Sequence, residues 1–419
     1  MRDGIFNRYL ILQKLRKAVN IYITGLGIIS GIGADVAGTL SSVRQGKTGL
    51  GSLSLFGSAH RNTVYVSEVK FTNDELRRMV GLPEGQIISR TALLGMKAAG
   101  EALSDAGFTA DERKTTALVS STSTGGMDLS EVFYRKMKEG RKPRLRYIVS
   151  HDCGDSTERI AAHHGLMHLC TTVSTACSSA ANAIMFGARL IRHGLADRVV
   201  AGGSDALTQF TLNGFRSLMI LDSAPCRPFD DTRAGLNLGE GAGYIVMESE
   251  QSVMKSGRKP YSCLTGYGNA NDAHHQTASS SEGNGPYLAM SKALAASRLL
   301  PDEIDYINAH GTGTLNNDLS EGRAMNRLFD GKLPAFSSTK ACTGHTLGAA
   351  GGIEAVFAVL AIRHGCIFPT LNFGQPMKEL PLIPQTKLST GVALRHVLSN
   401  SFGFGGNCSA LVFSGEKIQ

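Results

Sequence analysis

The sequence predicts an α/β fold made of two similar halves. Short β-prone runs alternate with helical patterns along the chain, and two short motifs occur twice in the same order. The 49 glycines among 419 residues also exceed the usual ~7%. Alternating strands and helices place largely buried sheets between helices, and glycine suits the tight turns and close backbone approaches of such folds.

The strands and helices can be placed in chain order. Strands are predicted at residues 64–69, 116–122, 198–201, 242–248 and 305–309, and helical patterns include 91–106 and 285–297. Two further helices, 177–194 and 348–365, are rich in small residues and end in basic residues and a glycine, which is a C-cap signal. Because such helices pack closely, we expect them to form the central layer.

The repeated motifs define the two halves. ITGLG at 23–27 resembles LTGYG at 264–268, and LIRHG at 190–194 resembles AIRHG at 361–365. The motifs lie farther apart in the first half, which predicts about 70 inserted residues there. We expect a basic extension at 1–20, a first half with the insertions at 21–262, and a second half at 263–419.

Composition excludes several classes of protein. A formal charge of +8 with 42% hydrophobic and 19% charged residues is typical of a folded globular protein. Polar residues interrupt the uncharged stretches, so no membrane span is expected, and nucleic acid is a poor partner because the chain has no Trp and no long basic run. Eight cysteines without a CxxC pair predict reduced thiols and a cytoplasmic location.

Cys177 is the first candidate for chemistry. The β-prone run Thr171–Ala176 leads directly into it, and a helix follows, so its thiol is predicted at a sharp strand-to-helix turn. A helix N-terminus lowers a thiol pKa, and its free N–H groups can hold an oxyanion. The plainer interpretation is a small buried cysteine.

Two histidines and a lysine lie downstream in glycine-rich turns. His310 follows a predicted strand in NAHGTGT, and His345 closes STKACTGH, which also contains Lys340. A cysteine that takes part in acyl transfer needs proton handling and charge stabilisation, which these side chains can provide. Each alone can also be structural or simply solvated.

Four motifs together carry a resemblance to a known family. TACSS at 175–179, NAHGTGT, STKACTGH and SFGFGG at 401–406 occur in the order found in elongating β-ketoacyl-acyl carrier protein synthases of the Cys-His-His type, and the chain most resembles synthase II. GGSD at 202–205 and RPFD at 227–230 lie between them. The resemblance covers roughly residues 21–415. It implies the thiolase fold, with duplicated halves in a five-layer αβαβα arrangement, and a homodimer.

The resemblance also implies residue roles. Cys177 would be acylated, His310 and His345 would face its thiol, and Lys340 would support His310, with Glu321 as a structural acid near Lys340. Phe404 would be a gate whose N–H joins that of Cys177 in an oxyanion hole. Further matches are the pantetheine contacts Thr277, Thr312 and Thr314 and the acyl-pocket residues Thr124, Phe215 and Phe402.

Several positions depart from the family's usual pattern. Leu315-Asn316-Asn317 replaces a stretch with proline and glycine, and Asn407-Cys408 stands where Thr-Asn is usual. Thr124 replaces an apolar acyl-pocket residue. Because an unpaired buried hydroxyl is unfavourable, Thr124 must bond locally or face a shorter, conjugated or more polar substrate; the second case predicts that medium-length or unsaturated primers outcompete saturated long ones.

The implied partner is an acyl carrier protein, whose phosphopantetheine arm carries the substrates; no cofactor and no metal are expected. Acyl carrier proteins are acidic, so a basic docking patch is predicted, with candidates Arg77, Arg78, Arg141, Lys142 and Arg216. The pair His164 and His168 has metal-ligand spacing but no carboxylate pattern beside it.

Several alternatives stay open. A thiolase shares the fold but uses coenzyme A and two cysteines, and Cys408 keeps that possibility open. A non-catalytic chain-length partner would lack the nucleophile, whereas a papain-like hydrolase would not explain Lys340 and a second histidine. The same chemistry also serves both fatty acid elongation and specialised polyene or pigment pathways.

Overall fold

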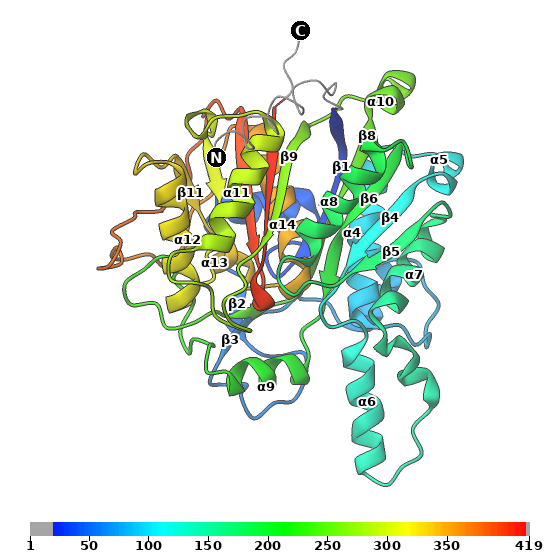
Figure 1. The fold of residues 1–419 in the computed structure, drawn as a ribbon. Helices are drawn as coiled ribbons and strands as arrows, with labels where there is room; N and C mark the ends of the chain where they lie inside the picture. The colour runs from blue at the N-terminus through cyan, green and yellow to red at the C-terminus, as the bar shows by residue number, and fades with distance from the viewer. Residues whose placement is uncertain (1–19, 416–419) are drawn as a thin grey trace.

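Ten strands form one hydrogen-bonded sheet (Figure 1). The computed structural model describes residues 20–415, so the basic extension predicted for 1–20 lies, except for Asn20, outside the described residues. In sheet order the strands are β11 (Ala335–Ser337), β10 (Tyr306–Asn308), β12 (His396–Phe402), β13 (Asn407–Ser414), β9 (Ser262–Asn271), β1 (Ile21–Ser30), β8 (Gly241–Ser249), β6 (Arg198–Asp205), β4 (Ala117–Ser121) and β5 (Cys170–Val173).

The strand order is symmetric about its centre, where β1 and β9 pair antiparallel. Outward from that pair, β1-β8-β6-β4-β5 on one side mirrors β9-β13-β12-β10-β11 on the other. In both halves the two inner pairings are antiparallel and the two outer pairings are parallel. The predicted duplicated α/β fold is confirmed, whereas the boundary at residue 262 stays a prediction.

Helices lie on both faces of the sheet and between its halves. The longer ones are α2 (Val36–Arg44), α4 (Arg90–Asp105), α6 (Met127–Lys138), α7 (Cys153–His164), α8 (Ser179–Arg192), α9 (Gln209–Ser217), α11 (Asn284–Ser297), α12 (Leu315–Leu328) and α14 (Ala350–His364). Shorter ones are α3 (Asn73–Met79), α5 (Ala110–Lys114), α10 (Glu250–Ser256) and α13 (Lys340–Thr343). The two helices predicted for the centre, α8 and α14, contact each other, with α4 and α7 outside the first half and α11 and α12 outside the second. This is the expected five-layer arrangement.

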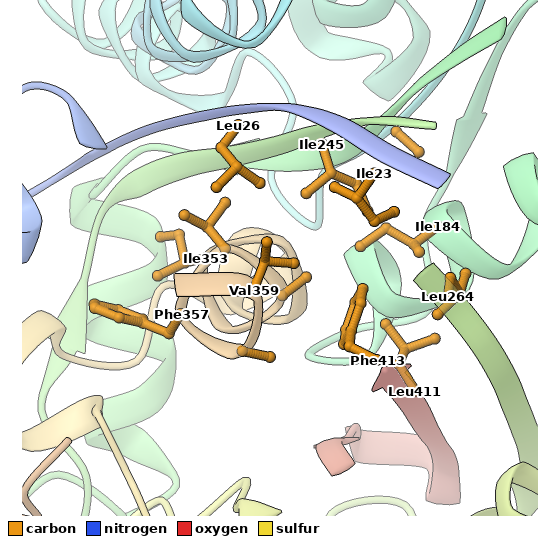
Figure 2. Close-up of a cluster of buried hydrophobic side chains, with 14 of the residues drawn as sticks. Ile23, Leu26, Ile184, Ile245, Leu264, Ile353, Phe357, Val359, Leu411 and Phe413 are labelled. Carbon is orange, nitrogen blue, oxygen red and sulfur yellow. The ribbon is translucent and has the colours of Figure 1, made fainter. Parts of the chain in front are cut away.

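The central layer contains the largest hydrophobic cluster. Figure 2 shows Ile353 and Phe357 of α14 in one cluster with Leu26 of β1, Ile184 of α8 and Phe413 of β13. The segment Leu347–His364 is long and apolar enough to cross a membrane by length and composition, but 83% of it is buried inside the protein. Its hydrophobicity is therefore explained by its place between the two halves of the ten-stranded sheet.

The repeated TGxG motif has a packing reason. A Cβ on Gly27 of β1 would lie 1.9 Å from the Ala98 carbonyl oxygen of α4, and a Cβ on Gly268 of β9 would lie 2.1 Å from the Ala289 carbonyl oxygen of α11. In each half, the outer helix thus packs directly against the inner strand at a glycine, where no side chain fits.

The connection between the inner strand and the outer helix is longer in the first half of the chain than in the second. Residues 31–89 connect β1 to α4, whereas residues 272–283 connect β9 to α11. The longer connection carries β2 (Leu50–Ser52) and β3 (Tyr65–Ser67), which form a small second sheet with β7 (Leu238–Gly239). β7 precedes β8, and a backbone hydrogen bond from Gly239 to the His345 carbonyl ties this sheet to the loop that carries His345.

Candidate active site

Cys177 lies in the tight connection between β5 and α8, as predicted. β5 ends at Val173 and α8 begins at Ser179, and Ala176 adopts a left-handed backbone with φ of 53°. A Cβ on Gly403 would lie 2.9 Å from the Thr175 carbonyl oxygen, so the glycine allows the 402–407 segment to pack directly on this turn. The thiol-bearing residue is only 5% exposed.

A cavity of about 220 Å³ opens beside Cys177. Its walls bring together nine of the predicted site residues: Cys177, Phe215, Thr277, His310, Thr312, Thr314, His345, Phe402 and Phe404. Lys340, Glu321 and Thr124 are not part of these walls. The sequence motifs from both halves of the chain therefore meet at one cavity.

Two neutral imidazoles face this cavity. The His310 and His345 rings lie 5.4 Å apart, nearly perpendicular. The Leu347 N–H donates to Nδ1 of His345 over 3.1 Å, and Nζ of Lys340 lies 3.2 Å from Nδ1 of His310. A backbone N–H and an ammonium group can only donate, so the Nδ1 atom of each histidine is an acceptor. In both neutral rings the proton therefore resides on Nε2. Burial, helped by the charge of Lys340, lowers the pKa of both rings well below 6.5, which keeps them neutral.

Lys340 is held behind His310 by a buried ion pair. Its Nζ pairs with Glu354 of α14 and donates to the His310 carbonyl over 2.5 Å. The expectation that Glu321 is the acid beside Lys340 needs correction, because Glu321 instead accepts the backbone N–H groups of His310 and Gly311, each at 2.8 Å. Glu321 thus shapes the histidine turn, and Glu354 balances the lysine charge.

Thr124 does not present a free hydroxyl to the cavity. Its Oγ1 donates to the Asp205 carboxylate over 2.8 Å, and its N–H donates to the same carboxylate over 3.1 Å. Thr122 and Gly348 also donate to Asp205. The hydroxyl is locally satisfied, so the predicted preference for medium-length or unsaturated primers loses its physical basis.

The segment that contains Phe404 is anchored to the turn that carries Cys177. Oδ1 of Asn407 accepts hydrogen bonds of 2.8 Å from both Ser178 and Asn182, and the Asn407 carbonyl accepts the Gly403 N–H over 2.8 Å. Asn407 therefore provides an anchor at the position where the family usually has threonine. The ring of Phe404 stacks on Phe215, with centroids 5.9 Å apart, across the cavity wall.

The prediction that the helix N-terminus lowers the Cys177 pKa is wrong. Burial raises the pKa of this thiol to about 11, and neither the N–H groups of Phe404 and Cys177 nor the charge of Lys340 offsets that effect. Those two N–H groups favour the thiolate, which is the arrangement that an oxyanion hole at this position requires. At physiological pH the Cys177 side chain is thus a thiol.

This pKa predicts how Cys177 reacts with iodoacetamide. The thiolate fraction, and with it the alkylation rate, should rise about tenfold per pH unit from pH 7 to pH 10, because only the thiolate attacks. In the unfolded protein the rate should level off just above the usual pKa of ~8.5. Peptide mapping at each pH gives the rate, and circular dichroism checks that the protein stays folded. A plateau for the folded protein near pH 7 would restore the helix-terminus interpretation.

The remaining candidates have structural partners. Nε2 of His164 bonds the Met96 carbonyl, and Nε2 of His168 bonds the Leu195 carbonyl, each at 2.8 Å. Across residues 20–415, no group of three or more His, Cys, Asp or Glu side chains is placed to hold a metal ion. Cys408 lines the cavity, but burial raises its pKa and its thiol donates to the Gly406 carbonyl.

Comparison with known proteins agrees with this geometry. The family models "Beta-ketoacyl synthase, N-terminal domain" and "Beta-ketoacyl synthase, C-terminal domain" match residues 18–252 and 261–374. The 3-oxoacyl-[acyl-carrier-protein] synthase 2 of Staphylococcus aureus (strain MRSA252) is 31% identical over 407 residues, covering 94% of this chain and 98% of its own. The mitochondrial 3-oxoacyl-[acyl-carrier-protein] synthase of Arabidopsis thaliana is 34% identical over 435 residues, covering 94% and 93%.

Solved structures lead to the same family. The ishigamide ketosynthase/chain length factor superposes with a TM-score of 0.90 at 29% identity, covering 96% of this chain and 100% of its own. A ketosynthase (ApeO) from Xenorhabdus doucetiae, in complex with its chain length factor (ApeC), gives 0.82 at 31% identity, covering 95% and 98%. Since the two family models match most of the chain, and the relatives and the solved structures cover at least 94% of it, the chain belongs to the beta-ketoacyl synthase family.

Proposed function

We propose that the protein catalyses the decarboxylative Claisen condensation of an acyl group on Cys177 with malonyl-acyl carrier protein, giving β-ketoacyl-acyl carrier protein in fatty acid elongation. The observation that carries this proposal is the pair of neutral imidazoles, each with its proton on Nε2, in the cavity that holds the buried thiol. Two such donors suit a reaction in which negative charge develops on an oxygen.

The first half-reaction is a transfer of the acyl group. The Cys177 sulfur attacks the carbonyl carbon of the acyl-carrier thioester, while the carbonyl oxygen accepts hydrogen bonds from the backbone N–H groups of Cys177 and Phe404. The bond to the carrier sulfur breaks, and the thiol proton leaves with the released carrier thiol. Because the Cys177 pKa is raised to about 11, this proton transfer accompanies the attack.

The second half-reaction forms the carbon–carbon bond. Malonyl-carrier loses carbon dioxide, and the electron pair of the broken bond forms an enolate. The enolate oxygen accepts hydrogen bonds from the Nε2–H groups of His310 and His345. The enolate carbon attacks the Cys177 thioester, the carbon–sulfur bond breaks, and Cys177 leaves as thiolate and is reprotonated from water. Lys340 keeps Nδ1 of His310 occupied, so that its proton remains on the side of the substrate.

The carrier arm would be bound by three threonines on the cavity wall. Thr312 and Thr314 share a hydroxyl–hydroxyl bond of 2.9 Å, and Thr277 lines the same cavity from another loop. The reaction needs no metal and no cofactor beyond this carried substrate. Of the docking candidates, Arg77 is engaged with Asp74 and the Gln86 carbonyl, and Arg141 is exposed but pairs with Glu139 at 3.4 Å. Arg78, Lys142 and Arg216 are exposed.

A second pathway is favoured by two of the comparisons. The ketosynthases similar to this chain at 29% and 31% identity are described together with a chain length factor. The same condensation in a specialised polyketide-like pathway, with a chain-length partner in place of a second identical subunit, is therefore the alternative to a homodimer in fatty acid elongation. In either case we place the reaction in the cytoplasm.

The test is condensation in vitro with defined acyl-carrier primers and malonyl-carrier. Mass spectrometry should find β-ketoacyl-carrier that is two carbons longer than the primer, and carrier affinity should weaken as salt rises, because exposed charges are screened over ~8 Å at physiological ionic strength. Turnover of coenzyme A thioesters at the same rate, with no effect of salt on carrier binding, would favour a thiolase instead.

A further inference from the structure

The segment that departs from the family pattern after HGTGT makes a specific contact. Asn316, near the start of α12, is exposed, yet its amide makes two hydrogen bonds with the backbone of Ser279: Oδ1 accepts the Ser279 N–H over 2.6 Å, and Nδ2 donates to the Ser279 carbonyl over 3.1 Å. Both residues line the active-site cavity.

The loop of residues 272–283 connects this contact to the gate. The Gly405 N–H donates to the Gln276 carbonyl over 2.7 Å, and the Asp272 N–H donates to the Gly406 carbonyl over 2.8 Å. The loop is therefore bonded to α12 at Ser279 and to the residues that follow Phe404 at Gln276 and Asp272. Thr277 lies between these two attachments and lines the cavity.

We propose that Asn316 is a positioning residue that clamps the 272–283 loop to α12. The clamp keeps Thr277 on the cavity wall together with Thr312 and Thr314, and it keeps Gln276 in place to hold Gly405 next to the gate. Its effect on carrier substrates rests on the proposed function, whereas its effect on the loop does not.

Arg323 provides a matched control, because it also joins α12 to this loop. Its guanidinium donates to the Ser281 carbonyl over 3.0 Å and pairs with Glu282 at 3.3 Å. None of these three residues lines the cavity. Replacing Arg323 thus tests a contact that only stabilises the loop, whereas replacing Asn316 tests a contact that positions the part of the loop lining the cavity.

Hydrogen exchange resolved to single amides tests the clamp without substrate. In Asn316→Ala, exchange at Ser279 and at Gly405 should be about tenfold faster than in wild type, because losing two hydrogen bonds loosens both attachments. Asn316→Asp keeps the acceptor for the Ser279 N–H and should give a smaller increase. Arg323→Ala should leave Gly405 unchanged. Unchanged exchange at Ser279 in Asn316→Ala, or faster exchange at Ser279 without any change at Gly405, would overturn the proposal.

Kinetics with carrier substrates provide the second readout. Asn316→Ala should raise KM for malonyl-carrier about five- to tenfold with kcat lowered no more than about twofold, which is the signature of lost substrate positioning. Arg323→Ala should keep the wild-type KM. A wild-type KM in Asn316→Ala would overturn the positioning role. If the chain showed no condensing activity at all, the proposed function would fail, and hydrogen exchange would still decide the clamp.

Discussion

Replacing Lys340 by Met is expected to destabilise the protein by about 3–5 kcal/mol and to remove nearly all condensing activity. Lys340 is 2% exposed, and its ion-pair partner Glu354 is equally buried. Without the ammonium, Glu354 is left as a buried carboxyl group with no opposite charge, and Nδ1 of His310 loses its donor. Urea unfolding measures the first effect, and the carrier assay measures the second.

The double variant Lys340→Met with Glu354→Gln separates the two effects. It removes both charges of the pair, so most of the lost stability should return, because a charge pair replaced as a whole is tolerated far better than a single unpaired charge. Activity should stay low, because His310 still lacks the donor that fixes its tautomer. A single variant destabilised by less than about 1 kcal/mol, or a double variant with full activity, would contradict this account of Lys340.

Replacing His310 or His345 by Ala should slow malonyl-carrier decarboxylation by about 10²–10³ for each single variant, which is typical for the loss of one oxyanion donor. Each ring presents an Nε2–H to the cavity, and both rings are neutral at physiological pH. Conversion of malonyl-carrier to acetyl-carrier, followed by mass spectrometry, measures this step without the condensation.

The control for the histidines is His274→Ala. This histidine is exposed in the 272–283 loop and does not line the cavity, so decarboxylation should stay within about twofold of wild type. The dissociation constant for malonyl-carrier should change little in His310→Ala and His345→Ala, because the donors act mainly on charge that develops during the reaction. Decarboxylation at the wild-type rate in both variants would remove the enolate-stabilising role.

The fold could be predicted from local patterns because its two halves repeat them. The TGxG motifs mark inner strands whose glycines accept an outer helix, and the paired small-residue helices mark the central layer. The alternation of strands and helices fixed the class, whereas the pairing of β1 with β9 brings together residues more than two hundred positions apart, and no local pattern contains that information.

The residues of the candidate site that lie in recognisable sequence motifs could be predicted. Cys177, His310 and His345 meet at one cavity as expected. Glu354 was missed, although the one acidic residue in the apolar helix α14 was a signal that a buried cation lies nearby. The Cys177 pKa was predicted in the wrong direction, because a helix terminus is visible in the sequence and the depth of burial is not.

The environment of the Thr124 hydroxyl also could not be predicted from the sequence. Its hydroxyl was expected either to bond locally or to face a substrate, and the sequence could not decide between the two. The partner that decides it, Asp205, lies at the end of β6 and comes close only because β4 and β6 are neighbours in the sheet. Long-range pairing, rather than residue type, determines what this hydroxyl does.

The mass of the protein after incubation with an acyl-carrier substrate and no malonyl-carrier tests most directly whether Cys177 carries the acyl group. One acyl group should be added per chain, peptide mapping should place it on Cys177, and Cys177→Ala should gain no mass and form no product. An acyl group on Cys408 or Cys342, or condensation by the Cys177→Ala variant, would contradict the proposed role of Cys177.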